Sequence, residues 1–222
     1  MKQKTYAILG LGIFGSTIAK TLSEYNCEVI GIDKDITCVE RVSEFATQAV
    51  QADFTDIDQL RAIGIEEVDV AVVATGSLLE ESIMAILNLK ELGVPYILAK
   101  AKNRMYMQIL LKIGADKVVR PEKEMGERVA KSLLSRNIIE MLDIDDEYSI
   151  MEMHAPRNWV GKALNALDLR AQFGINVLGV RKHAHESLRI SPSADYVIEA
   201  DDQLLVIVQN DEFEKFEYLG KI

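Results

Sequence analysis

Three glycines near the start of the sequence have the spacing of a phosphate-binding turn. Gly10, Gly12 and Gly15 follow an apolar run and precede a helical pattern, which predicts a strand, a tight turn and a helix. The first glycine lets the chain turn sharply, the second lets the backbone approach a pyrophosphate, and the third lets the helix pack against the strand. The unpaired amides at the start of such a helix favour phosphate groups. Ile13 and Phe14 lie inside this predicted nucleotide-binding turn.

A carboxylate at the end of the next apolar run gives the glycine pattern a context, which it needs because alone it is weakly specific. Asp33 lies roughly 20 residues after the turn, a spacing that suits hydrogen bonds to a ribose diol. Its charge would repel the additional phosphate of NADP. We therefore expect an adenine nucleotide with a free ribose, either NAD(H), ATP, ADP or AMP. The alternative is a coincidence of turn glycines and a surface aspartate.

Apolar runs alternate with helical patterns up to residue 134, which predicts an α/β fold with a doubly wound parallel sheet of six strands. Ligands bind such sheets at the carboxyl ends of the strands. Asp53 would present a carboxylate to the adenine edge or cap a helix, and Lys100 would reach a phosphate or stay solvated. Further residues expected at this edge are Lys34, Ala74, Thr75 and Gly76.

Composition narrows the classes of partner. The 222 residues carry a formal net charge of −10, which argues against nonspecific binding to nucleic acid or to an anionic membrane. No apolar run approaches the length of a membrane span, and no secretory pattern follows Met1, so we expect a cytoplasmic protein. The two cysteines form no metal-binding cluster by spacing.

The pattern changes after residue 134. We expect a nucleotide-binding domain over 1–135, an acidic connector over 136–146 and a small α+β domain over 147–222. A domain of this size is marginal alone, which makes dimerisation through an apolar face plausible. The small domain is expected to contain a helix over 161–167, a closing helix over 212–218, and strands over 148–153, 176–180, 187–190, 196–198 and 203–208.

Taken together, both halves resemble the RCK (regulator of potassium conductance, or KTN) proteins, the cytosolic nucleotide-binding subunits of Ktr and Trk potassium transport systems. The most discriminating segment runs from Gly114-Ala115-Asp116 to Pro121-Glu122, because dinucleotide dehydrogenases do not pair the glycine turn with a module like that around Val160-Gly161-Lys162. Other matching pieces are Gly31-Ile32-Asp33, Gln51-Ala52-Asp53, Leu98-Ala99-Lys100, Leu167-Asp168-Leu169-Arg170, Asn176-Val177-Leu178, Ser191-Pro192 and Asp201-Asp202-Gln203.

The resemblance implies a Rossmann-like TrkA-N domain followed by a TrkA-C domain, in a gating subunit that is not an enzyme. It implies homodimers that assemble into an octameric ring beneath a membrane potassium transporter, at the inner face of the membrane. Nucleotide exchange would change the ring and so the pore. Glu122 resembles a residue that approaches a divalent cation between subunits, although an acid in a first helical turn also stabilises its own helix. Many members carry arginine where this chain has Ile13, which leaves AMP and NAD(H) as occupants beside ATP and ADP.

The second domain also resembles related modules that bind cyclic di-AMP across a dimer interface. In that pattern Arg170 would pair with phosphate, Asn176 would brace polar groups and apolar side chains would line a base pocket. Asn165 departs from the pattern, since an aliphatic residue is expected there. The alternative is a local Asp168–Arg170 ion pair. The residues concerned are Leu164, Asp168, Arg170, Asn176, Val177 and Pro192, with Leu178 beside them.

Two rival functions remain open at the level of sequence. An NAD-dependent oxidoreductase would use the same first domain, but it needs a general acid or base near the nicotinamide, and no motif supplies one. A free-standing cyclic di-AMP effector, acting on something other than a potassium transporter, is the third interpretation.

Overall fold

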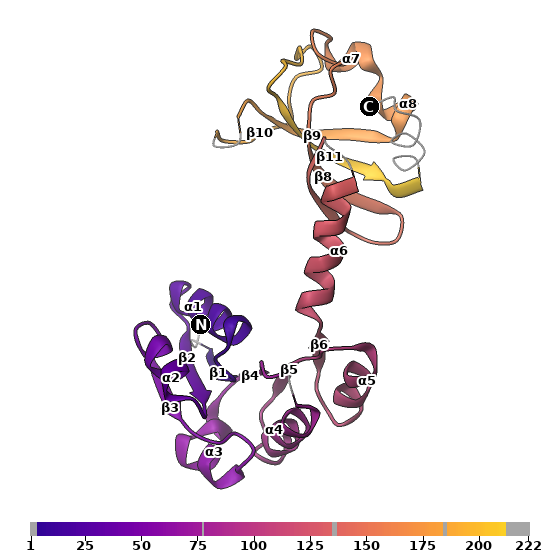
Figure 1. Ribbon diagram of the computed structural model, residues 1–222. Helices are drawn as coiled ribbons and strands as arrows, with labels where there is room; N and C mark the ends of the chain where they lie inside the picture. Colours follow the sequence, from indigo (N-terminus) through magenta and orange to yellow (C-terminus); the bar gives the residue numbers. More distant parts are fainter. Residues whose placement is uncertain (1–3, 77, 135–136, 184–185, 212–222) are drawn as a thin grey trace. The chain divides into compact units, whose positions relative to one another are not determined.

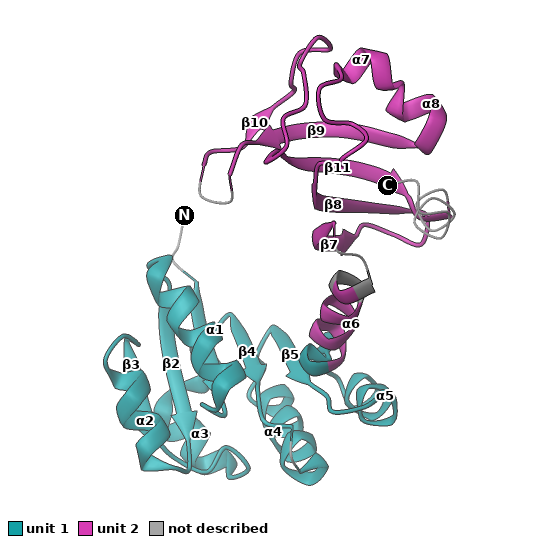
Figure 2. Cartoon of the chain, turned by 45° about the horizontal axis from the view of Figure 1, so that its top comes forward, with its two compact units in different colours: residues 1–122 teal, residues 123–222 magenta. Residues whose placement is uncertain are grey.

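The computed structural model describes residues 4–76, 78–134, 137–183 and 186–211. The chain forms two compact units, residues 1–122 and 123–222, which Figure 2 shows in teal and magenta. Within the described residues, no helix combines the length and the apolar character needed to cross a membrane.

The first unit is built on a six-stranded parallel sheet, which confirms the predicted α/β class (Figure 1). Its strand order, β3-β2-β1-β4-β5-β6, reverses direction between β1 and β4, so the sheet is doubly wound. All six strands fall on predicted apolar runs. They are β1 (Thr5–Leu9), β2 (Glu28–Asp33), β3 (Gln48–Gln51), β4 (Val70–Val73), β5 (Tyr96–Lys100) and β6 (Lys117–Val119).

Helices cover both faces of this sheet, and each face has its own apolar core. Along β1, Ala7 and Leu9 enter one core while Ile8 enters the other, as the alternation of a strand requires. Both faces being buried explains why these strands read as continuous apolar runs. The helices are α1 (Ile13–Glu24), α2 (Ile36–Ser43), α3 (Ile57–Ile63), α4 (Leu79–Glu91) and α5 (Arg104–Lys112), with a short 3₁₀ helix at Ile65–Glu67.

The register of the central strands brings their carboxyl ends to one edge. Leu9 on β1 lies opposite Ile32 on β2 and opposite Val73 on β4. The glycine turn, Asp33 and the segment from Ala74 therefore leave the sheet side by side.

The second unit contains most of α6 (Pro121–Leu134) and a five-stranded antiparallel sheet in the order β10-β9-β11-β8-β7. Trp159 is almost fully buried in its core and stacks on Phe173, with 6.1 Å between ring centroids. The elements are β7 (Ile138–Asp143), β8 (Tyr148–His154), α7 (Leu164–Leu167), α8 (Leu169–Phe173), β9 (Ile175–Arg181), β10 (Arg189–Ile190) and β11 (Gln203–Gln209).

The predicted connector over 136–146 is corrected by the structure. Ile138–Asp143 forms strand β7, which pairs antiparallel with β8 at the edge of the sheet. Ile138 is buried and Met141 packs on the core, while the residues between them are exposed. An edge strand with one solvated side mixes apolar and charged residues, and this mixture was the pattern taken for a connector.

Two smaller predictions also change, and a third lies outside the described residues. The strand expected over 196–198 is a single bridge between Val197 and Ala163. The helix expected over 161–167 is limited to α7, which begins only at Leu164 because Ala163 pairs with Val197 instead. Asp168, with φ 43°, separates α7 from α8. The closing helix expected over 212–218 lies outside the described residues.

Candidate functional site

The glycine turn has two positions that the fold requires and one that it leaves open. Gly10 has φ +94°, and a Cβ atom there would lie 3.0 Å from the Thr75 amide nitrogen. A Cβ atom on Gly15 would lie 1.9 Å from the Gly10 carbonyl oxygen, so only glycine lets α1 approach the turn. Gly12 has no such neighbour within 4 Å and a negative φ. The space beside Gly12 is therefore free for a ligand.

A cavity of about 350 Å³ opens at this edge of the sheet. It brings together most of the residues expected there, and it adds Phe54 and Glu81, which the sequence analysis missed. Glu81 lies in the first turn of the helix that follows β4, so the topology alone would have pointed to it. The lining residues are Gly10, Gly12, Asp33, Lys34, Phe54, Ala74, Thr75, Gly76, Glu81 and Lys100.

Five predicted residues lie outside that lining. Ile13 is 87 % exposed, and Gly15 is buried beneath the turn. Phe14, Asp53 and Glu122 contact lysines of the cavity, as described below.

The Asp33 carboxylate is fixed by backbone amides on both sides. One oxygen accepts a hydrogen bond from the Leu11 amide at 2.6 Å, and the other accepts one from the Asp35 amide at 2.9 Å. The first of these ties the end of β2 to the glycine turn. Asp33 is thus oriented toward the turn, where the ribose of a bound nucleotide would lie.

Lys34 is held between two carboxylates. Its Nζ atom lies 3.1 Å from Glu81 Oε1 and 3.3 Å from Asp53 Oδ1, and 5.6 Å from the centroid of the Phe54 ring. The hydrogen bond to Glu81 raises the pKa of Lys34 above its ordinary value, against a smaller effect of burial, and Asp53 adds to the rise. Lys34 therefore stays protonated, and Glu81 and Asp53 already balance its positive charge.

Asp53 does not cap a helix, which was one of its two expected roles. The cap of α3 is Asp56, whose side chain accepts hydrogen bonds from the amides of residues 58 and 59. Asp53 instead accepts hydrogen bonds from the amide and hydroxyl of Thr55, at 2.8 and 2.6 Å. Burial opposes ionisation of Asp53, but these bonds and Lys34 outweigh it and lower the pKa.

Lys100 is the second cation of the cavity. Its side chain is only 17 % exposed, lies over the Phe14 ring at 5.6 Å from the centroid, and forms an ion pair with Glu122. Glu122 belongs to the first turn of α6 and is 69 % exposed. The hydrogen bond from Lys100 lowers the pKa of Glu122, so the Glu122 carboxyl group is ionised near neutral pH.

The amino end of α1 completes the nucleotide cavity. Gly12 is the N-cap of this 12-residue helix, and neither a capping side chain nor an acidic residue satisfies its first turn. Open amides beside a glycine without a neighbour make a favourable place for phosphate oxygens.

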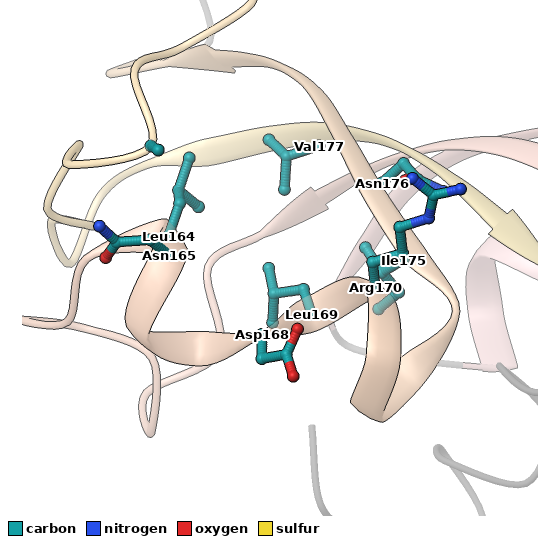
Figure 3. A pocket seen from close by; sticks show the side chains of 9 residues that line it. Leu164, Asn165, Asp168, Leu169, Arg170, Ile175, Asn176 and Val177 are labelled. Atoms are coloured by element: carbon teal, nitrogen blue, oxygen red, sulfur yellow. The ribbon is translucent and has the colours of Figure 1, made fainter.

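The second unit has a cavity of about 310 Å³ beside α7, α8 and the start of β9, shown in Figure 3. Leu169 and Ile175 are buried at its base, whereas Asp168 and Arg170 are exposed. Five of the six residues predicted for cyclic di-AMP line it. The lining consists of Leu164, Asn165, Asp168, Leu169, Arg170, Ile175, Asn176, Val177 and Ala194.

Pro192 and Leu178 do not line this cavity. The alternative role expected for its charged residues, a local ion pair between Asp168 and Arg170, is not observed. Within the described part of the chain, no ion pair joins Asp168 to Arg170. Asn165, the departure from the expected pattern, donates a hydrogen bond to Asp195 at 2.8 Å. Its side chain is thereby held at one side of the cavity.

Metal binding has no preformed site in the described parts of either unit. Among residues 4–76, 78–134, 137–183 and 186–211, no three His, Cys, Asp or Glu side chains are grouped so that they would hold a metal ion. Any cation at Glu122 would need further ligands.

Comparison with protein families and relatives agrees with both units. The TrkA-N domain model matches residues 6–121, and the TrkA-C domain model matches residues 149–219. Ktr system potassium uptake protein C of Bacillus subtilis (strain 168) is 38 % identical over 215 residues, covering 97 % of this chain and 96 % of the relative. Ktr system potassium uptake protein A of the same organism is 35 % identical over 220 residues, covering 99 % and 98 %.

Solved structures agree at the level of the fold. The crystal structure of the GsuK RCK domain superimposes with a TM-score of 0.66 at 18 % identity, over 98 % of this chain and 48 % of that one. At this identity the match concerns the fold alone.

Proposed function

The chain belongs to the TrkA-N/TrkA-C family of Ktr potassium uptake proteins, and from this premise we propose that it is a nucleotide-binding regulatory subunit of a potassium uptake system. The observation that carries the proposal is the cavity at the carboxyl edge of the parallel sheet. It combines an open glycine at a helix start, a carboxylate held beside the glycine turn and a half-buried lysine.

The proposed ligand is an adenine nucleotide, either NAD(H), ATP, ADP or AMP. Asp33 faces the ribose, the α1 amides face the first phosphate, and Lys100 is the cation within reach of further phosphates. Ile13 supplies no hydrogen-bond donor from its exposed side chain. We therefore propose that Lys100 is the side chain that distinguishes nucleotides by the number of their phosphates.

Coupling between ligand and protein follows from the Lys100–Glu122 pair. A nucleotide phosphate competes with Glu122 for Lys100, because one ammonium group cannot serve both fully. Once Lys100 turns to the phosphate, the Glu122 carboxylate is free to bind a divalent cation. Glu122 lies in the first turn of α6, the helix that leads into the second unit. A ligand shifts a conformational equilibrium only through such a difference between states.

The relatives' role in potassium uptake supports a membrane partner. We propose that the chain acts as a homodimer, assembled into an octameric ring, on a potassium-translocating membrane subunit at the inner face of the membrane. Its net charge of −10 disfavours nucleic acid as a partner. Its role is regulatory rather than enzymatic, since the cavity is accounted for by binding alone.

Calorimetric titration with ATP, ADP, AMP and NADH tests the proposal. The wild-type chain should bind at least one of these nucleotides. Asp33→Ala should weaken that binding by about 1.5–3 kcal/mol, the contribution of hydrogen bonds to a charged group. Asp58→Ala removes a carboxylate that is 86 % exposed on α3 and serves as the control. Equal affinity of wild type and Asp33→Ala would contradict the assignment.

A second function is favoured by the cavity in Figure 3, and we propose that it binds cyclic di-AMP. Arg170 supplies a cation without a partner among the described residues, Asn176 supplies an amide, and Leu164 and Val177 supply an apolar wall. Titration with cyclic di-AMP beside the nucleotides separates the two sites. If the chain binds NADH and not cyclic di-AMP, the second function is contradicted and an NAD-dependent oxidoreductase must be tested next. If it binds cyclic di-AMP and none of the nucleotides, a free-standing cyclic di-AMP effector is favoured.

A further inference from the structure

Lys34, which follows Asp33, raises the question whether the nucleotide bound here carries a 2′-phosphate. In dinucleotide-binding sheets, an acid at the end of the second strand binds the ribose hydroxyls, and a nearby cation accommodates a 2′-phosphate where one is present. This chain has both, since Lys34 directly follows Asp33. Lys34 also lines the same cavity. An unoccupied lysine here would welcome a 2′-phosphate.

The structure shows that Lys34 is occupied. Its ammonium group lies 3.1 Å from Glu81 Oε1 and 3.3 Å from Asp53 Oδ1. The ammonium group also lies over the Phe54 ring, 5.6 Å from its centroid. Three contacts therefore hold one lysine in place.

We infer that Glu81 is a specificity-determining residue of the nucleotide cavity: by holding Lys34, it makes the cavity reject nucleotides that carry a 2′-phosphate. The inference rests on the proposed function and names the ligand class more closely. A 2′-phosphate would meet the charges of Asp33 and Glu81, and it would have to take Lys34 away from Glu81 and Asp53.

Glu81 contributes more to this exclusion than Asp53 does. The Glu81 side chain is 27 % exposed and lines the cavity, so its charge acts directly on a ligand as well as through Lys34. Asp53 is 39 % exposed, lies outside the lining and is also held by Thr55. Removing the Glu81 charge would leave Lys34 with one weaker partner and free to turn to a phosphate.

The test compares two ligands that differ only in the 2′-phosphate. Binding of 5′-AMP and of adenosine 2′,5′-bisphosphate is measured by calorimetry on the full chain at one fixed ionic strength. The variant is Glu81→Gln, which keeps the side-chain size and removes the charge. Glu80→Gln is the matched control, because Glu80 is exposed in the same first turn of α4 and does not line the cavity.

The wild-type chain should prefer 5′-AMP. Glu81→Gln should reduce this preference by about tenfold, which is the size of one charge-assisted hydrogen bond at a partly exposed position. Glu80→Gln should leave the preference unchanged. Adding Lys34→Gln to Glu81→Gln should restore the preference, since the released cation is then absent.

Three outcomes would overturn the inference. The preference is unchanged in Glu81→Gln, or Glu80→Gln lowers it equally, or the double variant keeps the lowered preference. In each case 5′-AMP still binds the wild-type chain and the proposed function survives. If the wild-type chain binds neither ligand nor any other adenine nucleotide, the proposed function fails first and the inference falls with it.

Discussion

The two cavities differ in what their charged side chains do before a ligand arrives. In the first unit, Lys34 is paired with two carboxylates, Lys100 is paired with Glu122, and Asp33 accepts two backbone hydrogen bonds. In the second unit, within its described residues, the exposed side chains of Asp168 and Arg170 form no ion pair with each other. A ligand of the first cavity must displace existing interactions, whereas a ligand of the second would make new ones.

This difference indicates which cavity should select among ligands and transmit ligand binding to the rest of the protein. A preorganised network rejects ligands that cannot replace the interactions they break, and it transmits the exchange to the groups that are released. An open cavity with exposed charges gains most from a partner that covers it, which agrees with the proposed binding of cyclic di-AMP between two copies. The following experiments break or sharpen that contrast, beginning with the largest expected effect.

Gly15→Ala should affect the fold and the first cavity together. The added Cβ atom would lie 1.9 Å from the Gly10 carbonyl oxygen and 3.0 Å from the Ala74 Cβ atom, so α1 must move away from the sheet. We expect the free energy of unfolding of the first unit to fall by about 3 kcal/mol, the upper range for overpacking. Denaturant unfolding measures the loss, and titration should show that nucleotide binding is lost with it.

Gly12→Ala is the matched variant within the same turn. Its Cβ atom meets no neighbour within 4 Å, so stability should stay within about 0.5 kcal/mol of wild type. Nucleotide binding should nevertheless weaken, because the methyl group would occupy the space left for the phosphate. Equal stability losses in the two variants would show that the turn is not packed as described.

Arg170→Ala should remove cyclic di-AMP binding and leave the fold intact. The exposed guanidinium has no partner to lose among the described residues, so the free energy of unfolding should change by less than about 0.5 kcal/mol. The loss of its charge-assisted bonds to phosphate should cost about 2 kcal/mol of binding free energy. Calorimetry with cyclic di-AMP measures this loss, and nucleotide binding at the first cavity should not change.

Arg157→Ala is the control for that experiment, because Arg157 is also exposed in the second unit but does not line the cavity. If Arg157→Ala weakens cyclic di-AMP binding as strongly, the ligand responds to overall charge. If Arg170→Ala leaves cyclic di-AMP binding intact, the cavity in Figure 3 is not the site that binds this ligand.

Tyr196→Phe tests whether the second cavity has a fixed wall despite its open charges. The Tyr196 hydroxyl donates a hydrogen bond at 2.8 Å to Asp202, which is fully buried, and the Tyr196 carbonyl accepts one from the Leu164 amide. Removing the hydroxyl leaves a buried carboxylate with one donor fewer. We expect the free energy of unfolding to fall by about 1–2 kcal/mol at neutral pH.

The same bond predicts an alkaline limit of stability. Burial, together with the bond to Asp202, raises the pKa of Tyr196 to about 12 from 10.0. Because the folded pKa is the higher one, the stabilisation is complete below pH 10 and is lost as pH rises toward 12. Unfolding curves of wild type should therefore approach those of Tyr196→Phe over this interval. Parallel curves would contradict the assigned pKa.

Much of the first unit could be predicted from sequence because its signals are local. Continuous apolar runs mark strands buried on both faces, and the spacing of Gly10, Gly12 and Gly15 marks the turn. The edge residues then follow from the parallel topology alone. Phe54 and Glu81 were missed because they lie beyond the strand ends, in a loop and in the first turn of α4, although the topology brings the start of α4 to this edge.

The second unit was harder to predict because its signals are weaker. Strand β7 was taken for a connector, since an edge strand alternates too loosely to be distinguished from a loop. The short helix α8 was not predicted, and it is separated from α7 by Asp168, which has φ 43°. The cavity residues Asp168, Arg170 and Asn176 were named by family resemblance, and the structure brings them together without testing their ligand.

Glu122→Gln should change stability only slightly, and it tests the coupling between ligand and protein directly. Because Glu122 is 69 % exposed, solvent screening limits the contribution of its pair with Lys100 to less than about 1 kcal/mol. Its folded pKa is lowered from 4.5 by Lys100, so this contribution is present at neutral pH and is lost as pH falls through the lowered value. Unfolding curves of variant and wild type should therefore begin to converge as pH falls below 4.5 and coincide once pH lies below the lowered pKa of Glu122.

Nucleotide binding should change in the opposite direction to stability. Without the Glu122 charge, Lys100 is free for phosphate oxygens, so the variant should bind the preferred nucleotide more tightly than wild type in calorimetry. Asp58→Asn breaks another exposed ion pair, 3.3 Å from Arg61 and away from the cavity, and should leave affinity unchanged. If Glu122→Gln binds the nucleotide no more tightly than this control, phosphate does not compete for Lys100, and the charge network of the first cavity is structural rather than coupled to its ligand.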